Sequence, residues 1–208
     1  MKPLHRSGRF PARLRGFSMI EVLVSLMIVV LGLLGLAGLQ VRMQQAEFES
    51  YQRAQALVLL DDMVERISLH RHTPSCFWLT DSSTGLPYLG SGSSGAPACS
   101  ASTANNNTQT DLVIAEWHSL LRGASETKGG VAVGAMIGAR GCISYDAWSE
   151  LSDVGGGIIS NTGVYTVAVA WQGTTDTFAP TVNCANGQYG AETRRRVVST
   201  TFRLAALK

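Results

Sequence analysis

One carboxylate, that of Glu21, lies within an otherwise apolar run that extends from Phe17 to Leu39. As a helix, this run would be long enough to cross the roughly 30 Å hydrocarbon core of a bilayer. An ionisable group inside such a helix costs at least about 2.5 kcal/mol on insertion, so Glu21 is a candidate functional residue that needs a partner. The chemistry that suits it is an ion pair with an amine in a low-dielectric environment.

The segment before this run is basic. Residues 1–16 contain one lysine, four arginines and no acidic residue, which predicts that they stay on the cytoplasmic side while the rest is exported. An ordinary secretory signal has a shorter apolar core with a small-residue cleavage site after it, and the chain lacks this arrangement. Cleavage between Gly16 and Phe17 would instead leave a new amine one helical turn before Glu21 and on the same side.

The residues from Gly16 to Ser25, Gly-Phe-Ser-Met-Ile-Glu-Val-Leu-Val-Ser, resemble the class III signal of type IV prepilins and related pseudopilins. The resemblance implies that a prepilin peptidase cuts after Gly16 and N-methylates Phe17, and that Glu21 helps to dock the subunit in a filament. Residues 31–40 are similar to those of the minor pilins called type IV pilus modification proteins (PilV). The fold implied is α+β, with a long N-terminal helix packed on an antiparallel sheet in a disulfide-stapled head.

The same resemblance implies a structural subunit, not an enzyme, that helps to initiate or modify type IV pilus assembly. Its partners would be the inner membrane, the prepilin peptidase, major and minor pilins, the assembly machinery and a tip adhesin. It would cross the inner membrane once, with its N-terminus cytoplasmic and its head periplasmic, before it joins a pilus on the cell surface. Two alternatives remain open: a minor pseudopilin of a type II secretion system, and a signal-anchored periplasmic enzyme.

Charge argues against a nucleic-acid partner. The chain has 17 basic and 15 acidic side chains, and removal of the five leader charges leaves 12 basic against 15 acidic, a net charge of −3. Nucleic-acid binding depends on neutralising phosphates with an excess of Lys and Arg. A role in DNA uptake would rest only on Arg194–Arg196 and scattered basic residues, and the sequence does not distinguish it from adhesion or motility.

The four cysteines, Cys76, Cys99, Cys142 and Cys184, all lie in the part expected to be exported. An even set in an oxidising compartment favours disulfides over free thiols or zinc. Three pairings are possible. The sequential pairing, Cys76 with Cys99 and Cys142 with Cys184, closes the shortest loops and matches the stapled C-terminal region of pilin-like domains.

The helix is expected to continue past the membrane or filament-core segment 17–39. Residues 40–70 form an amphipathic extension without proline or glycine. Its apolar stripe is expected to comprise Phe48, Tyr51, Leu57, Val58, Val64 and Ile67, with Gln52 among the polar residues off the stripe. Glycines at 32, 35 and 38 leave two interpretations, close approach of a neighbouring helix or local melting in a filament.

Residues 71–208 are expected to form one globular head. The Ser-, Thr-, Gly-, Ala- and Asn-rich stretch 80–110 predicts a long loop, which would either make subunit-specific contacts or be a variable solvent loop. A short helix is expected over 111–124, capped by Thr110 or Asp111, with Val113, Trp117, Leu120, Leu121 and Ala124 on one face. Strands are expected over 131–137, 142–145, 163–171 and 195–204, the last two alternating clearly. These elements predict an α+β head.

No catalytic, metal or cofactor site is expected. His70 and His72 would not share a helix face, His118 belongs to no recognisable triad motif, and the Asp61, Asp62 and Glu65 cluster suits a solvated helix face. Two interpretations of Arg194-Arg195-Arg196 remain, the charged start of an edge strand or a patch for an anionic partner.

Overall fold

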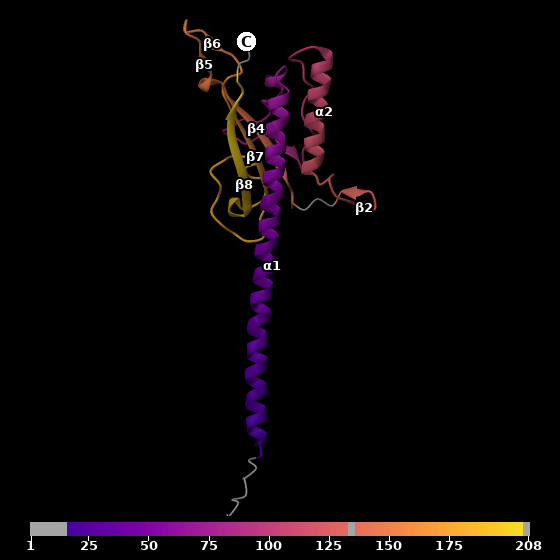
Figure 1. Cartoon of the computed structure of the whole chain (residues 1–208), viewed down its shortest axis with the longest axis vertical. Helices are drawn as coiled ribbons and strands as arrows, with labels where there is room; N and C mark the ends of the chain where they lie inside the picture. Colours follow the sequence, from indigo (N-terminus) through magenta and orange to yellow (C-terminus); the bar gives the residue numbers. More distant parts are fainter. Residues whose placement is uncertain (1–15, 133–135, 206–208) are drawn as a thin grey trace, which may run out of the picture. The chain divides into compact units, whose positions relative to one another are not determined.

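The computed structural model describes residues 16–132 and 136–205, and it is α+β, with one long helix, an antiparallel sheet and two disulfides (Figure 1). It divides into two compact units, residues 1–45 and 46–208. We call the second unit the head. Residues 1–15 of the expected leader lie outside the described residues.

Helix α1, Met19–Leu69, runs without interruption, as expected for a segment that lacks proline. It passes through Gly32, Gly35 and Gly38, and a Cβ added at any of the three would meet no other atom within 4 Å. In the head the other helix is α2, Ala104–Leu121, and three short 3-10 turns are η1 (Pro74–Phe77), η2 (Ala147–Ser149) and η3 (Glu192–Arg194).

The main sheet of the head has four antiparallel strands in the order β1-β4-β7-β8. They are β1 (Leu89–Gly90), β4 (Arg140–Asp146), β7 (Val164–Gln172) and β8 (Arg195–Arg203). Two separate hairpins, β2–β3 (Thr127–Lys128 and Val131–Ala132) and β5–β6 (Leu151–Ser152 and Ile158–Ile159), were not expected from the sequence. The strand expected over 131–137 is wrong in part, because β3 ends at Ala132 and residues 133–135 lie outside the described ranges.

Strand β7 is buried on both faces because each face packs against a different part of the head. Tyr165, Val167, Val169 and Trp171 are at most 3% exposed and contribute to the main core, which also contains side chains of α1 and α2. The opposite face belongs to a second cluster, formed by Cys142, Ala168, Ala170, Cys184, Ala185 and Tyr189. The alternation expected for β8 is also confirmed, since Val198 and Leu204 are buried while Ser199, Thr201 and Arg203 are exposed.

The expected apolar stripe of α1 is largely wrong. The buried residues are Gln52, Ala56, Leu60, Met63 and Ile67, which recur every three or four positions and therefore lie on one side of the helix. Tyr51, Leu57 and Val58 are 43–68% exposed. Small Ala56 and polar Gln52 occupy the core side, so choosing residues by apolar character placed the stripe on the wrong face.

The expected loop 80–110 and the expected helix 111–124 both need correction. Helix α2 already begins at Ala104, because Thr103 acts as its N-cap and accepts a hydrogen bond from the Asn106 N–H at 3.4 Å. Its buried residues are Thr110, Ile114, Trp117 and Leu121. The loop is thus shorter than expected, and it also contains β1, which pairs with β4.

Candidate functional site

The start of α1 is organised by Ser18. The Glu21 N–H donates to both the side-chain and the main-chain oxygen of Ser18, at 3.2 and 3.1 Å, and the Val22 N–H donates to the main-chain oxygen at 3.3 Å. Ser18 is therefore an N-cap and Glu21 occupies the third helical position, the spacing of a capping box. The sequence analysis missed this cap, although the Ser-Met-Ile-Glu spacing signals it.

Glu21 thus lies in the first turn of α1, where the helix dipole favours a negative charge. Gly16 and Phe17 precede the helix, and the Phe17 side chain is 82% exposed. Among the described residues, no lysine, arginine or histidine forms an ion pair with Glu21. The structure therefore brings the predicted cleavage position and the predicted docking residue together at one helix end.

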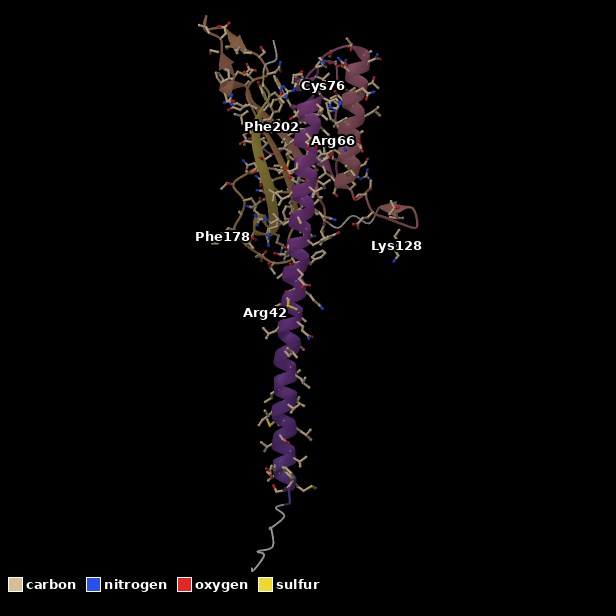
Figure 2. All side chains as sticks on the ribbon, in the orientation of Figure 1. Arg42, Arg66, Cys76, Lys128, Phe178 and Phe202 are labelled. Carbon is tan, nitrogen blue, oxygen red and sulfur yellow. A yellow bond between two sulfur atoms is a disulfide. The ribbon has the colours of Figure 1, made fainter. Side chains whose placement is uncertain are left out.

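The segment of α1 that follows Glu21 is apolar, and its side chains are exposed. Every large apolar side chain from Val22 to Met43 is 47–66% exposed, and in Figure 2 the side chains that precede Arg42 project to all sides of α1. A helix that is apolar all round is stable only inside a large core or in an apolar solvent such as lipid. By length and composition α1 can cross a membrane, as an anchor or as a signal sequence, and it is the one such helix in the described part of the chain.

The head is held to its own part of α1 by polar contacts as well as by the core. The Arg66 guanidinium lies 2.7 Å from both the Asp62 and the Glu116 carboxylates, which links α1 to α2. The hydrogen bond from Arg66 lowers the pKa of Glu116. The Trp117 indole N–H, fully buried, donates to the Leu59 carbonyl at 2.8 Å. These contacts fix residues 59–66 within the head.

Both disulfides lie in the head and join neighbours in sequence order. Cys76 is bonded to Cys99, across a separation of 23 residues, and Cys142 to Cys184, across 42 residues. This is the pairing that the sequence analysis favoured. The first ties η1 to the segment before α2, and the second ties β4 to the long connection between β7 and β8.

The three arginines at 194–196 all have acidic partners within the head. Arg194 pairs with Asp176 at 3.1 Å, Arg195 with Glu192 at 2.6 Å, and Arg196 with Glu49 at 3.5 Å. Arg195 is only 1% exposed and also donates to the carbonyl oxygens of residues 182 and 184. Since β8 is an edge strand, the structure favours a structural role for this run over an anion-binding patch.

The histidines make local contacts. His118 Nδ1 accepts a hydrogen bond from the Gly90 N–H at 3.0 Å, so that nitrogen is unprotonated. Burial, with a smaller contribution from nearby Arg122, lowers the pKa of His118. His70 Nδ1 lies 2.8 Å from the Arg66 carbonyl oxygen. No group of three or more potential metal ligands occurs among the residues that the structure describes.

Comparison with models of protein families, with curated proteins and with solved structures gave no match.

Proposed function

We propose that the protein is a minor type IV pilin of the PilV kind, a structural subunit that is processed by a prepilin peptidase and helps to initiate or modify pilus assembly. The observation that carries the proposal is the start of α1. There a capped helix places Glu21 one turn after Gly16-Phe17 and at the head of an uncovered apolar segment. The class III signal that these residues resemble would supply the processing step.

The uncovered segment suits a subunit that moves from lipid into a filament. Both surroundings are apolar, so the transfer exchanges one apolar contact for another and needs little hydrophobic driving force of its own. The membrane holds the chain before assembly, with the N-terminus cytoplasmic and the head periplasmic. In the filament the partners are the major and minor pilins, together with a tip adhesin.

Specificity then depends on charge. Hydrolysis of the peptide bond after Gly16 would free the amine of Phe17, and the peptidase would then transfer a methyl group to it from a methyl-donor cofactor. On assembly this amine would pair with the Glu21 carboxylate of an adjacent subunit. In a low-dielectric filament core, a carboxylate without its partner is heavily penalised. The pair would therefore set the register of the incoming subunit.

A minor pseudopilin of a type II secretion system is the alternative that shares the same observation. The two proposals differ in where the processed chain accumulates, namely in sheared surface filaments for a pilin and in the cell envelope for a pseudopilin.

Mass spectrometry of the N-terminus tests the proposal. The protein is isolated from filaments sheared from the native cell, and in parallel from the inner membrane. We expect a chain that begins with N-methylated Phe17 in the sheared fraction. A chain that begins at Met1 and occurs only in the membrane would contradict the proposal and favour a signal-anchored domain.

A matched pair of variants sharpens this test. Gly16→Leu alters the proposed cleavage position and is expected to leave an uncut chain in the membrane. Gly35→Leu makes the same change within α1, at a position where an added Cβ meets no other atom within 4 Å. We expect its cleavage to be normal, and equal processing of the two variants would argue against a cut at Gly16.

A further inference from the structure

A projecting hairpin in the head has no role in the function proposed above. We call residues 146–163 the arm; they comprise η2, β5 and β6 and the turns that connect them. The two strands of the arm pair with each other and with no strand of the main sheet. Figure 1 shows β5 and β6 standing clear of the four-stranded sheet and of α2.

The base of the arm is fixed to the sheet by hydrogen bonds. Thr162 is 1% exposed, and its hydroxyl accepts from the Leu151 N–H at 2.8 Å and donates to the Ile159 carbonyl at 2.6 Å. Arg203 of β8 donates to the Thr162 carbonyl at 2.8 Å. The Glu150 carboxylate accepts one hydrogen bond from the Asn161 N–H, at 2.8 Å, and another from the Tyr145 hydroxyl of β4.

The turn at the end of the arm is also fixed. The Asp153 carboxylate accepts hydrogen bonds from the N–H groups of Gly155 and Gly157, at 2.9 and 2.7 Å. Gly156 has a φ of 82°, a left-handed conformation that glycine adopts without strain. The arm therefore holds its shape without a partner, so a binding event would lose little conformational entropy in ordering it.

Despite this order, the arm buries few of its apolar side chains. Trp148 and Val154 are fully exposed, Ile158 is 72% exposed and Leu151 51% exposed. Leu151 pairs with Ile159, and Ser152 with Ile158, so Leu151 and Ile158 lie on opposite faces of the hairpin. Single exposed apolar residues are normal, but a cluster on a rigid projection marks an interaction site. Because both faces are apolar, the arm suits a cleft better than a flat surface.

The charge of the arm selects its partner. Residues 146–163 contain three acidic side chains, Asp146, Glu150 and Asp153, and no lysine or arginine. An anionic lipid surface would repel this segment, whereas a cleft rimmed by basic side chains would attract it. A groove of the head itself, lined by Val58, Leu120 and Met136, has Asp62 as its charged lining residue, which disfavours this groove of a second copy as the cleft that receives the arm.

We infer that the arm is a docking element that inserts into an apolar cleft with a basic rim on another protein. Trp148 and Val154 supply the apolar contact, and Asp153 supplies the charge at the rim. This inference goes beyond the proposed function, because it requires neither cleavage at Gly16 nor assembly of a filament.

Photo-crosslinking in intact native cells tests the inference. The full chain carries benzoylphenylalanine in place of Val154, and a second chain carries it in place of Phe178. Phe178 is 96% exposed and lies on a different loop, outside the arm (Figure 2). The crosslinked peptides are identified by mass spectrometry.

We expect position 154 to yield an adduct with one other protein, on an apolar segment that contains lysine or arginine, and position 178 not to yield that adduct. An adduct with lipid, an adduct with a second copy of this chain, the same adducts from both positions, or no adduct at all would each overturn the inference.

Two substitutions separate the apolar and the charged contributions in the same assay. Trp148→Ser is expected to reduce the crosslink at position 154 at least about tenfold, as for a tryptophan at the centre of an interface. Asp153→Asn keeps an acceptor oxygen for the turn but removes the charge, and a reduction of about two- to fivefold is expected, as for a charge at an interface rim.

Phe178→Ser is the matched control for Trp148→Ser. Both side chains are almost fully exposed, so neither change is expected to alter thermal unfolding of the head. Equal crosslink yields in the two variants would overturn the assignment of Trp148 to the contact.

Discussion

The two halves of α1 have the same secondary structure and opposite surroundings. Up to Gln45 the helix lies in the first unit, where the large apolar side chains from Val22 to Met43 are 47–66% exposed. From Ala46 to Leu69 the helix belongs to the head. One face of this half is at most 2% exposed, and this face includes Leu60 and Met63. One helix thus combines a segment that is packed within its own domain with a segment whose apolar side chains the described residues leave exposed.

Helix formation and side-chain burial therefore have separate causes. Both halves satisfy the backbone in the same way, but only the head half has a sheet and a second helix to pack against. The apolar side chains of the first half remain exposed. Changes in the two halves should therefore affect different measurements.

The largest effect is expected from reduction of the disulfides, both of which lie in the head. Each disulfide contributes about 3–4 kcal/mol to a stability that is only about 5–15 kcal/mol for a domain, so loss of both should unfold the head. The first half of α1 should remain helical in detergent. Near-ultraviolet circular dichroism reports on the head, whose four tryptophans are the only ones in the chain, and far-ultraviolet dichroism reports on helix.

An unchanged near-ultraviolet spectrum, after alkylation has shown that all four cysteines are reduced, would mean that the core holds the head without its disulfides. A loss of all helical signal would instead show that the first half of α1 depends on the head.

The same substitution made in both halves sharpens the comparison. Leu60→Ala should lower the free energy of unfolding of the head by about 2–5 kcal/mol, because Leu60 is 2% exposed and its removal leaves a cavity. Leu34→Ala is the matched control, since Leu34 is 64% exposed and belongs to neither core cluster of the described residues. Denaturant unfolding of the full chain in detergent, followed by tryptophan fluorescence, measures both. Similar losses in the two variants would contradict the division of α1.

The smallest effect is a pH dependence confined to the head. Burial lowers the pKa of His118 in the folded head below its ordinary value of 6.5, so the unfolded chain binds a proton first as the pH falls. Stability is therefore full above about pH 6.5 and decreases below it, down to the lowered pKa of the folded state. Measuring unfolding between pH 7 and pH 5 tests this.

His118→Asn is the control for this pH effect, since its amide oxygen can accept from the Gly90 N–H and does not titrate in this range. We expect a flatter stability profile in this variant. An unchanged slope would assign the pH dependence between pH 7 and pH 5 to groups other than His118.

The sequence predicted elements whose patterns are regular and local. The ends of β7 and β8 were predicted to within one residue, because large apolar side chains alternate along β7 and along β8 from Val198 onward. The continuous helix was predicted because residues 17–70 contain no proline and residues 39–70 contain no glycine. Glu21 was identified because a charge in an apolar run is conspicuous, and its position in the first turn of α1 agrees with that pattern.

Features that depend on tertiary contacts were not predictable in this way. Gln52 and Ala56 are fully buried on the core side of α1, although one is polar and the other small, so a search for large apolar residues does not identify that side. The early start of α2 depends on Thr103, which resembles the loop residues around it. Arg195 is buried because carbonyl oxygens of the connection before β8 surround it, and β5 and β6 are too short to show alternation.

We propose that the first half of α1 contacts other chains, whereas the second half packs within its own head. The most direct test compares Glu21→Val with Glu47→Val, the same change on an exposed residue of the head half of the same helix. The amount of each variant in sheared filaments is divided by its amount in the membrane. We predict that this ratio falls at least about tenfold for Glu21→Val, equivalent to about 1.4 kcal/mol, and stays at the wild-type value for Glu47→Val. A normal ratio for Glu21→Val, with normal piliation, would contradict the account.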